Sequence, residues 1–81
     1  MEEIIPLISI IVEKDGDISK LNDLLHEYSE YIIGRMGIPY RKKDINIISV
    51  AIDAPQDVIN ALTGNMGKLS GITAKAAYSK Q

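Results

Sequence analysis

DINIISVAIDAPQDVINALTGNMGKLSGITAKAAY, residues 44–78, carries the signals of a strand, a helix and a second strand in succession. β-Branched residues dominate Ile45–Asp53 and favour a strand. A helical pattern follows from Pro55, and Ile72–Tyr78 returns to the two-residue alternation of a strand. We therefore expect the helix to cross over between two strands of one sheet.

The predicted helix has a start signal and a stop signal. Gln56 stands three residues after Asp53, as in a capping box, and Pro55 suits the first turn. Asp53 is therefore the expected cap, and Gly67 or Gly71 is the expected end. Apolar residues spaced by three and four form one stripe, which we expect to be buried: Val58, Ile59, Leu62, Met66 and Leu69.

The first half of the chain repeats this pattern. Ile4–Val12 is almost entirely apolar and predicts a buried central strand. Glu13–Asp17 is a turn. Asp17 or Ser19 is expected to cap a helix that runs to about Ile32. The apolar stripe of this helix is Ile18, Leu21, Leu25, Tyr28 and Ile32.

Between the two halves, Ile33–Tyr40 mixes strand-forming residues with two glycines and a proline. We interpret it as an irregular strand. Gly34 or Gly37 marks either a bend such as a β-bulge, or a point where a ligand or partner chain approaches closely. The sequence leaves both alternatives open.

In order, these elements predict an α+β, ferredoxin-like fold, β-α-β-β-α-β, as a single domain over residues 1–81. Right-handed crossovers place two helices on one face of a four-stranded antiparallel sheet. The other face is then left without helices.

Alternation in the first and third strands predicts which residues lie on that uncovered face: Leu7, Ser9, Ile11, Ile47, Ser49 and Ala51. A solvated sheet face would carry more charge. Single exposed aliphatic residues are common on proteins, but an aliphatic patch of this kind often marks an interaction surface. We therefore expect an oligomer interface here, in a homodimer or a dimer of dimers.

Few residues suit catalysis or metal binding. The chain has no Cys and one His, His26, on the polar side of the first helix. Asp23 and Glu30 share that side, as in a weak surface metal site, but a solvated charged face explains the same residues. We expect no enzyme activity, no metal site and no cofactor.

The charge and the hydropathy of the chain argue against nucleic acid and membranes as binding partners. Lys and Arg number 9 against 11 Asp and Glu, for a net charge of −2. DNA-binding domains are usually basic, so no direct nucleic acid binding is expected. No apolar run approaches the ~20 residues of a membrane span, and no secretory signal precedes the first strand. These features predict a cytoplasmic protein that does not associate with membranes.

Two segments resemble known regulatory domains. VEKDGDISKLNDLL (12–25) and KLSGI (68–72) resemble the opening and the close of ACT domains. More specifically, GRMGIPYRKKDINIISVAID (34–53) and ALTGNMGKLSGI (61–72) resemble the iron-only hydrogenase system regulators. Those proteins are short, and similar in fold to ACT domains and to the C-terminal domain of nickel-responsive regulators. The resemblance spans nearly the whole chain, and it supports an ACT-like form of the ferredoxin-like fold.

The resemblance implies a regulatory module of the iron-only hydrogenase system, ligand-sensing or protein-interacting, with a link to transcriptional regulation. The metal site of nickel-responsive regulators uses several His and a Cys, which this chain lacks. The first strand also lies too close to Met1 for their DNA-binding segment, so we expect action through a protein partner or a ligand. The alternative is a small metal-handling or enzymatic accessory protein, since this scaffold hosts many functions.

If the module senses a small molecule, we expect the site at a subunit boundary. The residues concerned are Asp15, Gly16 and Asp17 in a loop, and Gly34, Arg35 and Gly37 in a strand. The loop leads into a helix N-terminus, which favours an anionic group, although its two Asp residues favour an amino-acid-like zwitterion. In the strand, Arg35 can pair with a carboxylate. A plain turn and a bulge explain the same residues.

Overall fold

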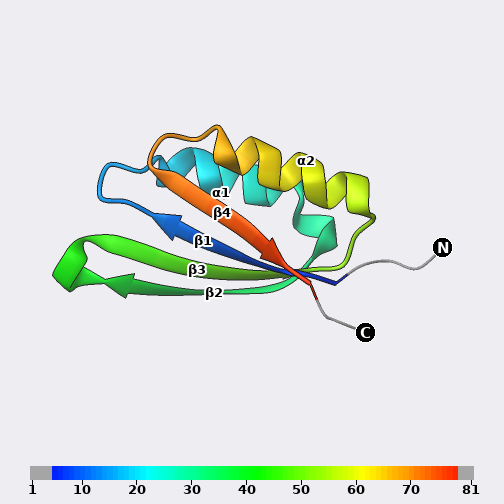
Figure 1. Cartoon of the computed structure of the whole chain (residues 1–81), viewed down its shortest axis with the longest axis horizontal. Helices are drawn as coiled ribbons and strands as arrows, with labels where there is room; N and C mark the ends of the chain where they lie inside the picture. Colours follow the sequence, from blue (N-terminus) through cyan, green and yellow to red (C-terminus); the bar gives the residue numbers. More distant parts are fainter. Residues whose placement is uncertain (1–4, 79–81) are drawn as a thin grey trace.

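The computed structural model describes residues 5–78 and has the expected ferredoxin-like α+β fold (Figure 1). The two main helices and two short 3₁₀ turns alternate with four strands: β1 (Leu7–Val12), α1 (Ile18–Glu27), η1 (Ser29–Tyr31), β2 (Ile32–Tyr40), η2 (Arg41–Lys43), β3 (Ile45–Ile52), α2 (Gln56–Gly67) and β4 (Ile72–Ala77). Ile4, where the first strand was expected to begin, lies outside the described residues.

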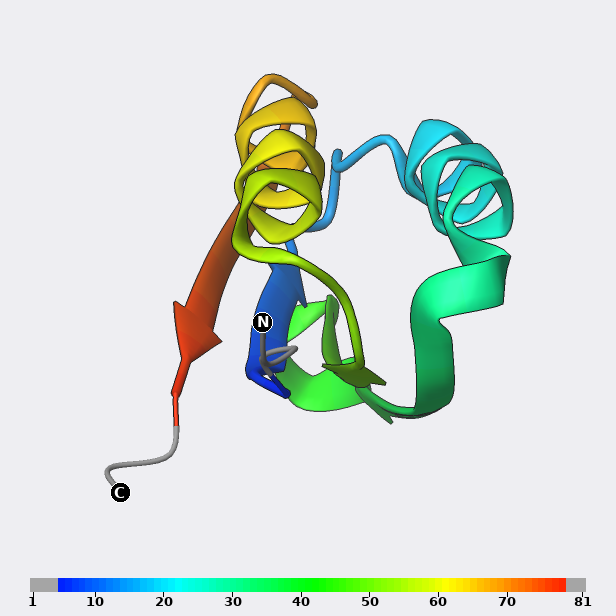
Figure 2. The ribbon, with the colours of Figure 1, turned by 90° about the vertical axis from the view of Figure 1, so that its right-hand side faces the viewer.

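The four strands form one antiparallel sheet in the order β2-β3-β1-β4. The central strand β1 pairs with β3 on one side and with β4 on the other, so that Ile10 lies opposite both Ile48 and Ala74. Strands β2 and β4 are the two edges. Both helices lie on the same side of the sheet, as the view along the sheet shows (Figure 2).

The core lies between the helices and the sheet. Alternate residues of β1 are buried, namely Ile8, Ile10 and Val12, because a strand turns every second side chain to the same face. The predicted helical stripes supply the other layer: Leu21, Leu25, Ile59, Leu62 and Met66 are buried. The apolar periodicity therefore positions both helices, and it leaves the opposite sheet face uncovered.

The first helix is shorter than predicted. It ends at Glu27 instead of continuing to Ile32, and one 3₁₀ turn follows. The main-chain carbonyl of Tyr31 accepts a hydrogen bond from the Asp53 N–H at 2.9 Å. This tertiary bond turns the chain away from the helix axis and into β2.

The predicted cap of the first helix is confirmed and that of the second is wrong. Asp17 Oδ1 accepts a hydrogen bond from the Lys20 N–H at 3.1 Å. The N-cap of α2 is Pro55, whose side chain has no acceptor. Asp53 Oδ1 is buried without a hydrogen-bond partner among the described residues. Pro55 is extended and α2 begins at Gln56, which is two residues later than capping by Asp53 requires.

Candidate functional site

The sheet face that the helices leave bare is the first candidate site, called here the open face. All six residues predicted for it lie there, in two strands that face each other in register: Leu7, Ser9 and Ile11 of β1 opposite Ala51, Ser49 and Ile47 of β3. Leu7, Ile11 and Ile47 remain 46%, 39% and 43% exposed, whereas Ile8, Ile10 and Ile48, which point toward the helices, are buried. The predicted placement on this face is confirmed; that it forms an oligomer interface stays a prediction.

Strand β2 extends the open face in a way that sequence analysis missed. Met36 and Ile38 lie opposite Ser49 and Ile47, and they are 71% and 62% exposed. Tyr40 follows on the same face, 41% exposed. The signal that could have found them is the spacing of two that these three residues share. It was obscured by Gly37 and Pro39, which alternate with them.

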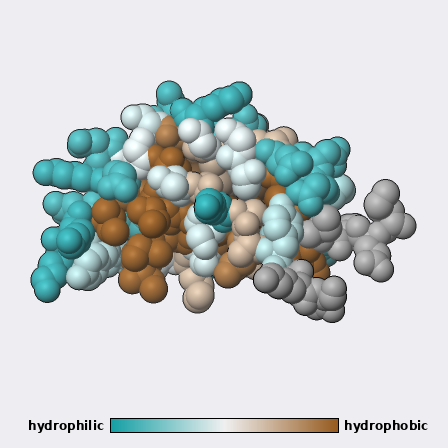
Figure 3. Space-filling model, viewed as in Figure 1, coloured by the Kyte–Doolittle hydropathy of each residue, from teal (hydrophilic) through white to brown (hydrophobic). Residues whose placement is uncertain are grey.

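The apolar residues of the open face form rows across the strands. One row runs Ile38, Ile47, Ile11 and then Thr73 of β4. In the described strands Lys75 is the one charged residue on this face, on the β4 side. Hydrophobic residues accordingly gather below the helices, where β1, β3 and β2 run (Figure 3).

The size of this patch is notable for so small a domain. Leu7, Ile11, Met36, Ile38, Tyr40 and Ile47 are its large apolar members. Together they expose on the order of 600 Å², at the upper end of the largest patch on a typical monomer. A face of this size and composition is suited to bind another apolar surface.

The predicted ligand loop is held by backbone contacts within the chain. The Gly16 N–H donates to Glu13 O at 2.8 Å, and the Asp17 N–H donates to Ser70 O at 3.0 Å. The Ile18 N–H donates to Gly16 O, also at 3.0 Å. These N–H groups, which were the reason to expect an anion at this helix N-terminus, are therefore already engaged.

Gly16 has a structural explanation in Gly71. A Cβ at position 16 would lie 2.8 Å from Gly71 O, and a Cβ at position 71 would lie 2.7 Å from Gly16 Cα. Gly71 also has a φ of +69°, the left-handed region that glycine favours. The loop after β1 and the loop before β4 thus touch backbone to backbone, which only glycines permit.

The second predicted group, around Arg35, lies elsewhere. Arg35 is opposite Val50 and hence level with Ile8, at the start of β1, whereas the loop follows the other end of that strand. The structure therefore does not bring the two groups together. Neither group's role in binding a ligand is tested, and both stay predictions.

The two glycines of β2 differ from Gly16 and Gly71. The sheet register shifts between Ile32 and Gly34, so a bulge is present at this point, one of the two alternatives left open by the sequence. A Cβ at Gly34 would meet nothing within 4 Å, and one at Gly37 would meet only Ile48 Cγ1, at 3.8 Å. Packing within the described chain therefore does not require a glycine at either position.

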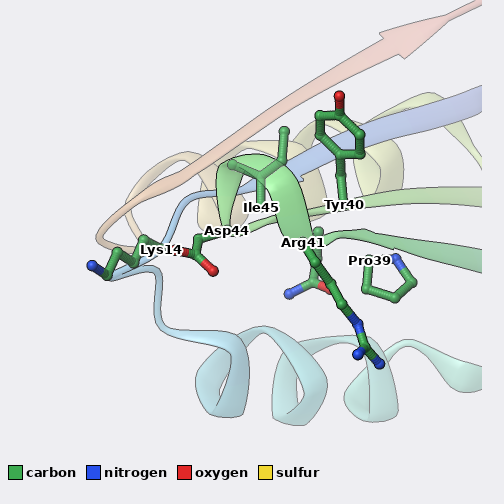
Figure 4. Close-up of a pocket in the computed structure, with 7 residues that line it drawn as sticks. Lys14, Pro39, Tyr40, Arg41, Asp44 and Ile45 are labelled. Carbon is green, nitrogen blue, oxygen red and sulfur yellow. The ribbon is translucent and has the colours of Figure 1, made fainter.

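Among residues 5–78, shallow cavities on the surface include three of similar size. The first, of about 240 Å³, lies beside the β2–β3 turn; there Tyr40 and Ile45 point to the opposite side from Arg41 (Figure 4). The second, of about 350 Å³, lies between the helices. The third, of about 330 Å³, lies between α1 and β2, and its lining includes Arg35 and the lone His26.

No group of three or more His, Asp or Glu residues within 5–78 is placed to hold a metal ion. No helix in that range is long and apolar enough to cross a membrane. The candidate sites in residues 5–78 are therefore the open face and the shallow cavities.

Comparison with known proteins agrees with the resemblance drawn from the motifs. The profile of the TM1266-like family, described as "Iron-only hydrogenase system regulator, putative", matches residues 4–76. The solved structure of the uncharacterized protein TM1266 from Thermotoga maritima is similar, with a TM-score of 0.92 and 34% sequence identity. That match covers 98% of this chain and 100% of the other. A search of curated proteins found no significant match.

Proposed function

Because the chain belongs to the TM1266-like family of iron-only hydrogenase system regulators, we propose that it is a non-catalytic regulatory module that works as a homo-oligomer. Its subunits meet through the open face. The assembled module controls the expression or the assembly of the iron-only hydrogenase, through contacts with a protein partner or in response to a small ligand.

The observation that carries this proposal is the apolar, nearly uncharged open face. A second copy is the simplest occupant, because a two-fold interface places the same patch on both sides. Two such patches bury on the order of 1,200 Å² in total, the lower end of the range for stable interfaces. Lys75 stands at the β4 end of the row formed by Met36, Ser49 and Ser9. The adjacent row of Ile38, Ile47 and Ile11 carries no charge, so packing it against its copy brings no like charges together.

The assembly is tested by placing a charge in the middle of the open face. We expect Ile47→Lys to convert the assembly into folded monomers at micromolar concentration, because a buried lysine without a partner is costly. The matched control is Ile18→Lys, since Ile18 is 38% exposed but lies at the start of α1. Sedimentation and light scattering give the mass; a parent protein that is already monomeric overturns the proposal.

The regulatory role is tested in the organism whose genome encodes the protein. Removing the gene should change the transcript level or the activity of the iron-only hydrogenase, and the parent gene should restore it. The gene for Ile47→Lys should fail to restore it, whereas that for Ile18→Lys should succeed. Unchanged transcripts and unchanged hydrogenase activity after removal of the gene contradict the role.

A further inference from the structure

The groove between α1 and β2 differs from the other two cavities in its charge. Its lining is Asn22, Leu25, His26, Ser29, Ile32 and Arg35, without an acidic residue. The cavity at the β2–β3 turn contains Asp44 beside its cations, and the cavity between the helices contains Asp23 and Glu27. This groove alone among the three therefore presents cationic and polar groups with no carboxylate to neutralise them.

Within residues 5–78, Arg35 has a hydrogen-bond partner but no ion pair. One of its terminal nitrogens donates to Asn22 Oδ1 at 3.3 Å, which joins the edge strand to the middle of α1. Within residues 5–78 the one ion pair is Lys20 Nζ with Asp17 Oδ2, at 3.8 Å. The guanidinium has five N–H donors in a planar fork, so a single amide contact leaves most of them available. Such a fork matches a carboxylate in two-point contact.

The floor of the groove is apolar. Leu25 is 2% exposed and belongs to the core, and Ile32 is half-buried against it. His26 and Ser29 supply further polar groups on the helix side. At about 330 Å³ the groove is at the small end of ligand sites. It thus combines a cation that has one hydrogen-bond partner, polar neighbours and an apolar base.

We propose that this groove binds a small organic monocarboxylate with a compact apolar body. Arg35 holds the carboxylate, Asn22 orients Arg35, and His26 donates a second hydrogen bond. Leu25 and Ile32 contact the apolar body. The C-terminal end of α1, at Glu27, lies beside the groove and carries the negative end of the helix dipole. The negative helix end opposes any anion, and it opposes a phosphate dianion more than a monocarboxylate.

The proposal is independent of the oligomer, because every lining residue comes from one chain. The groove and the open face lie on opposite sides of β2: Arg35 points toward the helix side and Met36 toward the open face. Monomeric Ile47→Lys protein should therefore bind the same ligand. Loss of assembly and loss of ligand binding are thus separately measurable.

The test uses isovalerate and benzoate as probes, titrated into the ¹⁵N-labelled full chain at fixed pH and ionic strength. We expect saturable amide shifts at Asn22, His26, Ser29 and Arg35. Isovaleramide, which has the same shape without the charge, and inorganic phosphate should bind far more weakly. The absence of saturable shifts with both carboxylates, or equal binding of the amide, overturns the proposal.

A pair of variants assigns the site. Arg35→Gln should weaken carboxylate binding about tenfold or more, as expected for losing a charged hydrogen-bond donor. Arg41→Gln, which removes a cation from the cavity at the β2–β3 turn, should leave binding unchanged. The amide spectrum of each variant reports whether it is folded. Unchanged affinity in Arg35→Gln, or an equal loss in Arg41→Gln, places the carboxylate elsewhere and refutes the assignment.

Discussion

Replacing Gly71 by alanine tests the backbone contact between the two glycine loops. A methyl group at this position would lie 2.7 Å from Gly16 Cα and 2.9 Å from Gly16 N, a distance at which backbone must move. The two loops would separate, and the hydrogen bond from the Glu13 N–H to Gly71 O, now 2.8 Å, would lengthen or break. An added Cβ at Gly34, Gly64 or Gly67, by contrast, would meet nothing within 4 Å.

The expected cost has two parts. A residue with a Cβ in the left-handed region loses about 1–2 kcal/mol relative to glycine, and the φ of Gly71 is +69°. The lost hydrogen bond adds about 1 kcal/mol. Gly71→Ala should therefore lower the free energy of unfolding by about 2–3 kcal/mol, a large part of the total for a domain of this size.

Gly64→Ala is the matched control. Gly64 lies inside α2, where an added Cβ would meet nothing within 4 Å. Alanine favours a helix interior over glycine by up to about 1 kcal/mol, so this variant should gain stability. Urea denaturation followed by circular dichroism, at one protein concentration because association stabilises the folded state, measures both. Equal stability of Gly71→Ala and the parent, or a loss in Gly64→Ala, refutes the reasoning.

Two further changes have expected outcomes. Asp17→Ala should cost about 1 kcal/mol in the same urea experiment, because the cap on the Lys20 N–H is lost; an unchanged midpoint contradicts the capping role. Met36→Lys should weaken self-association as Ile47→Lys does, because both lie on the open face; ultracentrifugation showing the parent's mass would exclude β2 from the interface.

The periodicity of apolar residues was sufficient to predict which side chains face the core in strands that are buried on one face only. In β1, and in β3 from Ile48 onward, every second residue is apolar and buried, so their faces and the open face followed from spacing alone. The end of α1 did not follow, because the bond between Tyr31 and Asp53 joins distant segments. The face of β2 was missed since Gly34 and Gly37 interrupt its alternation.

The candidate site was less predictable than the fold. The loop around Gly16 was interpreted as a ligand site. The local sequence pattern does not reveal that Gly71, far along the chain, packs against Gly16 and explains the glycine. Arg35 was singled out from its glycine neighbours, but its partner Asn22 and the groove with His26 exist only once α1 packs beside β2. Contacts between α1 and β2 depend on how the helix packs beside the sheet, and the local sequence around each residue does not determine them.

The position of β1 in the sheet has a consequence for synthesis of the protein. This apolar strand is made before the other three strands of the sheet, yet one of its two partners, Ile72–Ala77, is made after them. Until then β1 keeps a free edge, and the loop at Gly16 has no Ser70 or Gly71 carbonyl to bind. A growing chain on the ribosome therefore cannot complete the domain step by step. Its sheet closes only when the final strand emerges, so the unfinished chain is the form most exposed to aggregation.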